Sequence, residues 1–83
     1  MSVIRIEEIA RADGSVEIKV DGVLNRDSLN LLDKVCRFYL NKERKIFLNL
    51  NGMIHITREG RNYLRGIKNA VSFTESPCFL KFS

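Results

Sequence analysis

The sequence predicts a small α/β domain in which a mixed β-sheet carries two helices on one face. Apolar and polar residues alternate, as in half-buried strands, over residues 3–9, 15–20 and 46–50. Apolar residues recur at every third or fourth position, as in amphipathic helices, over residues 25–40 and 58–69. The chain has 83 residues, which is enough for one domain with a modest core. We therefore expect a single domain over residues 1–83.

The first two strands are expected to form a hairpin. In Val3–Ile9, Ile4 and Ile6 alternate with charged residues, and the same pattern recurs from Ser15 to Val20. Asp13-Gly14 lies between the two segments, and Asp-Gly in this position is a strong hairpin signal. The alternation predicts one buried face and one face exposed to water.

A helix is predicted from Asn25, a favourable N-cap, to about Leu40. It carries one apolar stripe, made of Leu29, Leu32, Val35, Cys36 and Tyr39. The polar connection over residues 41–44 leads to a strand at Ile46–Leu50. A strand, a helix and a strand joined by short connections predict a right-handed crossover between parallel strands.

The last third of the chain is expected to hold a second helix and a final strand. Residues 51–57 are interpreted as a short loop that ends at Thr57, the N-cap of a helix from Arg58 to about Asn69. Val71–Pro77 is interpreted as a loop, because Pro77 cannot continue a helix. Phe79–Phe82 is interpreted as an edge strand. The predicted order is β-β-α-β-α-β, with the second face of the sheet largely uncovered.

Composition and charge exclude several classes of protein. The net charge of +4 is mildly basic, and no apolar segment approaches the roughly 20 residues that a membrane span needs. Met1–Glu8 carries acidic residues and does not resemble a signal peptide, so we expect a cytoplasmic protein. Cys36 and Cys78 are expected to be reduced thiols. With one histidine and no Cys-x-x-Cys, neither a metal site nor a cofactor is expected.

Two segments resemble the STAS domain, the fold of bacterial anti-sigma factor antagonists. Val20–Asn25 is similar to that family's strand ending in Gly-x-Leu-Asp. Leu48–Gly60 looks, without a gap, like its signature Leu-Asp-Leu-Ser-Gly-Val-x-Phe-Ile-Asp-Ser-Ser-Gly. The paired first strands also look like the family's opening, so the resemblance covers nearly the whole chain. It implies a non-catalytic regulatory domain that binds a serine kinase acting also as an anti-sigma factor.

The resemblance implies a docking corner for a protein partner, made of Asn25, Thr57, Arg58, Glu59 and Gly60, with Arg61 and Arg65 alongside. In the family, a serine just before the last glycine is phosphorylated, and the modified domain releases its partner. Glu59 stands at that position, and a carboxylate does not accept a phosphoryl group in this switch. The resemblance therefore implies a domain held in one signalling state.

Simpler interpretations of two of these residues stay open. Glu59 is also a favourable residue in the first turn of a helix, where its charge meets the positive end of the dipole. Thr57 is explained by capping alone, although its hydroxyl makes it an alternative phosphoacceptor. Neither interpretation needs a partner.

Two further functions also stay open. A self-assembling structural subunit would form a homodimer through its sheet edge or its uncovered face. A weak nucleic-acid binder would use the basic row on the second helix, made of Arg58, Arg61, Arg65 and Lys68. Tyr63, the aromatic residue of this helix, is expected on its apolar side and not among the basic residues, so nucleic acid is the less favoured partner. His55, in the predicted loop, has no reactive side chain placed to work with it, and no enzyme is expected.

Overall fold

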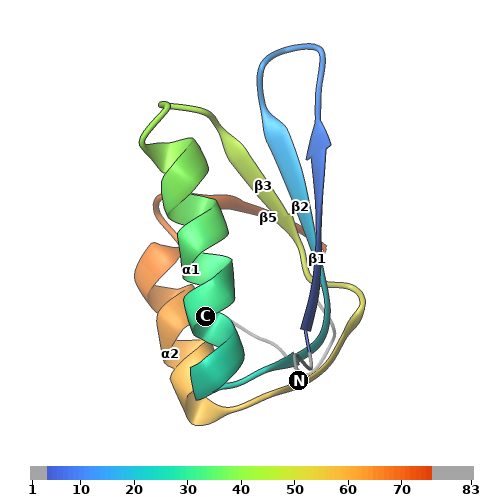
Figure 1. Cartoon of the computed structure of the whole chain (residues 1–83), viewed down its shortest axis with the longest axis vertical. Helices are drawn as coiled ribbons and strands as arrows, with labels where there is room; N and C mark the ends of the chain where they lie inside the picture. Colours follow the sequence, from blue (N-terminus) through green and yellow to red (C-terminus); the bar gives the residue numbers. More distant parts are fainter. Residues whose placement is uncertain (1–3, 76–83) are drawn as a thin grey trace.

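The computed structural model describes residues 4–75, and this part of the chain forms a mixed sheet with both helices on one face (Figure 1). The elements of the described part are β1 (Ile4–Ala10), β2 (Val16–Leu24), α1 (Arg26–Leu40), β3 (Ile46–Asn49), β4 (Met53–Ile56), α2 (Arg58–Ile67) and β5 (Ser72–Glu75). The predicted α/β class is therefore confirmed. No helix within residues 4–75 is long and apolar enough to cross a membrane.

The sheet is built around β2, which pairs on both sides. β1 runs antiparallel to β2, and β3 runs parallel to it, with β5 parallel to β3 on the far side. β3 pairs with β2 at residues 16–19, and β4 pairs with it at residues 22–24. β3 and β4 therefore follow one another along the same side of β2. The turn between them is held by the amide of Gly22, which donates to the carbonyl oxygen of Gly52 at 3.1 Å.

The order of elements differs from the predicted one in two places, and both involve strands of four residues. β4 occupies part of the predicted 51–57 loop, so that His55 lies in a strand. Its buried residues, Met53 and Ile56, are three positions apart, because the pairing with β2 shifts register between Gly22 and Val23. A period of three hides a strand from a search for strict alternation. β5 likewise occupies part of the predicted Val71–Pro77 loop.

Other boundaries move by a few residues. β2 continues to Leu24, beyond the predicted end at Val20, because β4 pairs with this extension. α2 ends at Ile67, two residues before the predicted Asn69. The predicted strand Phe79–Phe82 lies outside the described residues.

The core lies between the sheet and the two helices. The sheet contributes side chains that alternate along β2 and β3, and Ile18, Val20, Ile46 and Leu48 are fully buried. The predicted stripe of α1 faces them, with Leu32 and Cys36 buried and Leu29, Val35 and Tyr39 packed around them. α2 adds the fully buried Leu64.

The opposite face of the sheet carries polar groups that satisfy one another. Arg11 forms an ion pair with Glu17 at 3.4 Å and lies over the ring of Phe47 at 4.6 Å. The side-chain amide of Asn49 donates to Glu17 at 3.2 Å, and this bond is the main cause that lowers the pKa of Glu17. Arg11, Glu17 and Asn49 therefore have partners within this face, which also carries Phe47.

Candidate functional site

The N-terminus of α1 is fixed by a reciprocal cap. The Asn25 side-chain oxygen accepts from the amide of Ser28 at 2.9 Å, and the Ser28 hydroxyl oxygen accepts from the amide of Asn25 at 2.8 Å. The same hydroxyl donates to the carbonyl oxygen of Val23 at 2.8 Å, which ties the helix start to the end of β2. Asn25 is therefore the N-cap of α1, as predicted, and this capping role is separate from its predicted place in the docking corner.

The N-terminus of α2 is attached to the same strand end. The Thr57 hydroxyl accepts from the amide of Gly60 at 3.3 Å, which confirms the predicted N-cap. It also donates to the carbonyl oxygen of Leu24 at 3.3 Å, and the amide of Thr57 donates to that oxygen at 2.9 Å. Because Asn25 follows Leu24 directly, the two helix starts lie side by side at one edge of the molecule (Figure 1).

Gly60 is buried where α2 crosses the end of β2. A β-carbon placed on it would lie 2.7 Å from the carbonyl oxygen of Leu24 and 2.9 Å from the Leu24 side chain. It would also lie 3.1 Å from the Ile56 side chain. A glycine at this position thus allows the helix to approach the strand, and Gly60 belongs to the support of the corner and not to its outer surface.

The outer surface of the corner carries charges of both signs. Arg58 and Glu59 are exposed in the first turn of α2, and Arg26 is exposed in the first turn of α1. The Glu59 carboxylate lies 3.9 Å from the Arg26 guanidinium. This exposed ion pair links the start of α2 to the start of α1. Arg65 is exposed farther along α2, and Arg61 is half-buried.

Local hydrogen bonds keep Glu59 ionised. Its own backbone amide is the largest cause that lowers its pKa, and the Thr57 hydroxyl and the nearby Arg26 and Arg58 act in the same direction. A carboxylate that is charged at neutral pH therefore stands at the start of α2, where the helix dipole also favours it. At neutral pH the start of α2 presents this anion near the guanidinium groups of Arg26 and Arg58, and Asp27 is a second exposed acidic residue in the first turn of α1.

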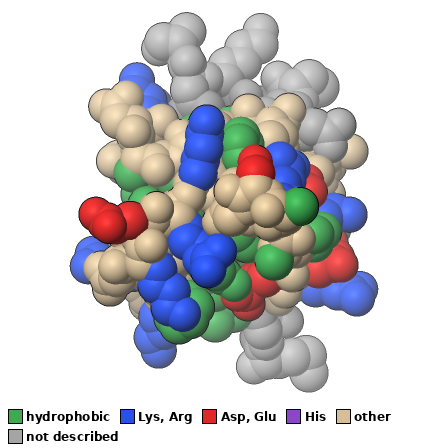
Figure 2. All heavy atoms as spheres, turned by 90° about the horizontal axis from the view of Figure 1, so that it is seen from above, with side chains coloured by type: hydrophobic (Ala, Val, Ile, Leu, Met, Phe, Trp, Pro, Cys, Tyr) green, Lys and Arg blue, Asp and Glu red, His purple; other side chains and the backbone are tan. Residues whose placement is uncertain are grey.

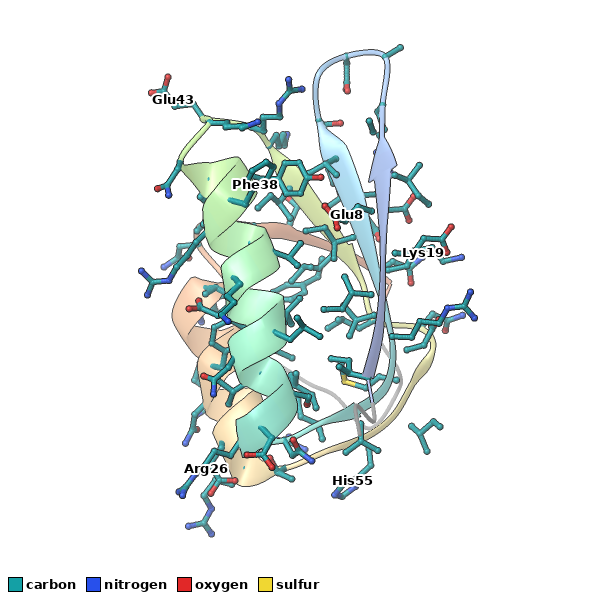
Figure 3. The ribbon with its side chains drawn as sticks, in the orientation of Figure 1. Glu8, Lys19, Arg26, Phe38, Glu43 and His55 are labelled. Atoms are coloured by element: carbon teal, nitrogen blue, oxygen red, sulfur yellow. The ribbon has the colours of Figure 1, made fainter. Side chains whose placement is uncertain are left out.

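Two residues of this edge were missed by the sequence reasoning. Arg26 follows the predicted N-cap, and only the pairing of the two helix starts brings it to Glu59. Ile54 is 76% exposed on β4, the strand that leads into Thr57. Ile54 was overlooked because its segment was interpreted as a loop. Figure 3 places Arg26 and His55 at the same end of the molecule.

The opposite end of the molecule has a shallow cleft of about 430 Å³. It lies between the β1–β2 turn and the connection from α1 to β3, and Figure 2 shows Lys and Arg side chains over this end. These cations already have partners within the chain. Arg44 donates to the carbonyl oxygen of Gly14 at 3.0 Å, and Lys42 lies 4.2 Å from the centre of the Phe38 ring. Lys45 lies 5.2 Å from the centre of the Phe47 ring.

Within residues 4–75, no group of three or more His, Cys, Asp or Glu side chains is placed to hold a metal ion. Cys36 is 1% exposed, and burial raises the pKa of its thiol to about 11, so this thiol is a poor nucleophile. His55 is exposed on β4.

Comparison with known proteins assigns no family to this chain. No protein-family model matches it, and no curated protein matches it at a significant level. The paired helix starts and the sequence resemblance are therefore the features that bear on its function.

Proposed function

We propose that this chain is a non-catalytic regulatory domain that binds a protein partner through the docking corner. The corner is the edge where α1 and α2 begin, made of the predicted residues Asn25, Thr57, Arg58, Glu59 and Gly60, with Arg61 and Arg65 alongside, and Arg26 is added to it. The observation that supports this proposal best is that both helix starts are attached at the end of β2. The amide of Thr57, which caps α2, donates to the carbonyl oxygen of Leu24, and the next residue, Asn25, caps α1. This attachment gives a rigid edge with charged groups directed outward.

The partner in this proposal resembles the kinases that bind STAS domains and act as anti-sigma factors. Arg58 and Arg26 provide two guanidinium groups for acidic side chains of the partner, with Glu59 between them for a basic one. Glu59 holds the domain in one signalling state, because no hydroxyl stands at that position. A protein with this role acts in the cytoplasm.

Thr57 is not the switch in this proposal. Its hydroxyl already donates to Leu24 and accepts from Gly60, and a phosphate on it would remove the proton donated to Leu24 and bring negative charge against that carbonyl oxygen. Incubation with ATP and a kinase of the family type is therefore expected to leave both positions 57 and 59 without phosphate. Phosphopeptide mapping that finds the label on Thr57 would contradict a domain held in one signalling state. It would indicate a phosphorylation switch at Thr57 in place of one at position 59.

Affinity purification from the native cells tests the partner directly. The tagged protein is compared with Glu59→Ser, Arg58→Glu and a control, Arg37→Glu, which reverses a charge near the far end of α1. We expect an ATPase of the histidine-kinase type or an anti-sigma factor in a different amount with Glu59→Ser, and less of it with Arg58→Glu. The control should resemble the unchanged protein. Equal recovery with all four forms, or recovery of the tagged protein alone, contradicts the proposal.

A further inference from the structure

β1 presents a strand edge beside an exposed apolar helix face. Within residues 4–75, β2 is the only strand that pairs with β1, so the outer side of β1 from Arg5 to Ala10 forms an edge of the sheet. On α1, Leu31 is 44% exposed and Phe38 is 52% exposed. These two residues are seven positions apart, two helical turns, and share one face. A strand edge next to apolar surface is a place where another chain pairs.

A groove joins this edge to the helix. It has a volume of about 290 Å³ and is lined by Glu8 of β1 and by Lys34, Val35 and Phe38 of α1. In Figure 3, Glu8 and Phe38 lie on either side of the gap between the two elements. The Tyr39 hydroxyl donates to the Glu8 carboxylate and holds it at the rim. A strand added to β1 would place its inward side chains in this groove.

We infer that the groove and edge bind a second copy of this chain, whose β1 pairs antiparallel with β1 about a twofold axis at Ile6. The register with β2 places Ile6 on the helix side of the sheet and Arg5 and Glu7 on the opposite side. Centred on Ile6, the pairing puts Arg5 of each copy opposite Glu7 of the other. Two cross-strand pairs of opposite charge then close the outer face.

Other symmetric registers are disfavoured by charge. Centring the pair on Arg5, Glu7 or Glu8 places that residue directly opposite its own copy, and like charges face each other. Centring it on Ile9 makes Glu7 face Arg11. Arg11 is already engaged by Glu17 at 3.4 Å and by the Phe47 ring at 4.6 Å. Of the registers centred on Arg5, Ile6, Glu7, Glu8 or Ile9, the one at Ile6 therefore pairs opposite charges without drawing a residue away from another contact.

The apolar residues fit the same arrangement. In the pair centred on Ile6, the two Ile6 side chains lie next to each other on the helix side, with β-carbons roughly 4.5–5.5 Å apart. They lie on the side of the sheet that faces the groove lined by Val35 and Phe38, and Leu31 lies on the helix face that carries Phe38. None of these residues belongs to the docking corner, so the inference stands or falls independently of the proposed function.

Sedimentation velocity over a range of concentrations tests the charge pairs. We expect Arg5→Glu and Glu7→Arg each to weaken self-association by about tenfold, because each variant creates two like-charge pairs. The double variant restores opposite charges and should recover most of the loss. Thermal unfolding of each variant checks that the monomer remains folded, since Arg5 and Glu7 also face Asp21 and Lys19 within the sheet. A monomer at every concentration up to about 1 mM, or no recovery in a folded double variant, overturns the inference.

A second pair of variants tests the apolar face. Phe38→Ser removes a half-exposed ring and should weaken self-association, whereas Ile54→Ser, at a more exposed isoleucine on β4, should leave it unchanged. If the two variants weaken self-association equally, the association depends on exposed apolar surface in general and not on a defined interface.

Oxidative cross-linking tests the register itself. Ile6→Cys in a Cys78→Ser background places two thiols next to each other at the twofold axis, and mild oxidation should convert most of the protein into a disulfide-linked dimer. Ile54→Cys in the same background is the matched control and should stay largely monomeric. Folded Ile6→Cys protein that cross-links no faster than the control excludes this register.

Discussion

The carbonyl oxygen of Leu24 accepts two hydrogen bonds from Thr57, one from its amide at 2.9 Å and one from its hydroxyl at 3.3 Å. Leu24 ends β2 and directly precedes the cap of α1, whereas Thr57 caps α2. One peptide unit thus sets the positions of both helix starts relative to each other. The docking corner depends on this contact more than on any of its exposed charges.

Removing the Thr57 hydroxyl should destabilise the domain. Thr57→Val has nearly the same shape but loses both the cap to Gly60 and the bond to Leu24. We expect the free energy of unfolding to fall by about 1–2 kcal/mol, measured by urea denaturation. Thr57→Ser keeps the hydroxyl and should lose less than half as much. A larger loss in Thr57→Ser than in Thr57→Val would show that the methyl group, and not the hydroxyl, supports the corner.

Two glycines of α2 should respond in opposite directions to the same substitution. A β-carbon at Gly60 would lie 2.7 Å from the Leu24 carbonyl oxygen, whereas one at Gly66 has no atom within 4 Å. Gly60→Ala should therefore cost about 1–3 kcal/mol, because backbone has to move. Gly66→Ala should add roughly 0.5–1 kcal/mol, since alanine favours the helix. Thermal or urea unfolding measures both, and a stabilising Gly60→Ala would contradict the packing described here.

The parts of the fold that were predicted correctly are those governed by neighbouring residues. Asn25 and Thr57 cap their helices because their side chains reach an amide three residues away. Asp13 accepts from the amide of Ser15 at 2.9 Å, and Gly14 has a φ of 90°, so the hairpin turn also follows from local chemistry. These contacts need nothing from the rest of the chain.

The parts that were not predicted depend on distant residues. β4 forms because Met53 and Ile56 lie against the extension of β2, some thirty positions earlier in the chain, and its four residues carry no pattern strong enough alone. The pairing of Arg26 with Glu59 depends in turn on that placement. Among the predicted site residues, the exposed Arg58 and Glu59 were placed correctly at a helix start, whereas the burial of Gly60 emerged only from the packing of α2 on β2.

The stability of the domain should depend on pH through Glu17. The hydrogen bond from Asn49, together with Arg11, holds the pKa of Glu17 below its ordinary value of 4.5. The unfolded chain therefore binds this proton more readily than the folded one. The stabilising contribution is complete above about pH 4.5 and is lost as the pH falls through the folded pKa.

Glu17→Gln tests this contribution by urea denaturation at two pH values. The variant should be less stable than the unchanged protein at pH about 7, and the difference should shrink at a second pH well below 4.5, where Glu17 itself becomes protonated. Asn49→Ala removes the hydrogen-bond donor and should narrow the difference at neutral pH. A difference between the unchanged protein and Glu17→Gln that stays constant between the two pH values would rule out ionisation of Glu17 as its source.

The thiol of Cys36 should be unreactive until the domain opens. Cys36 is 1% exposed on the core side of α1, and burial raises its pKa to about 11, so little thiolate is present at pH 8 and reagents have no access to it. In a Cys78→Ser background, we expect labelling by an aromatic disulfide reagent to be slow in buffer and immediate in denaturing urea. The labelling rate in buffer should increase in Thr57→Val, because that variant populates open states more often. Rapid labelling of the folded protein would mean that α1 and α2 separate readily, and the shared attachment at Leu24 would then not make the corner rigid.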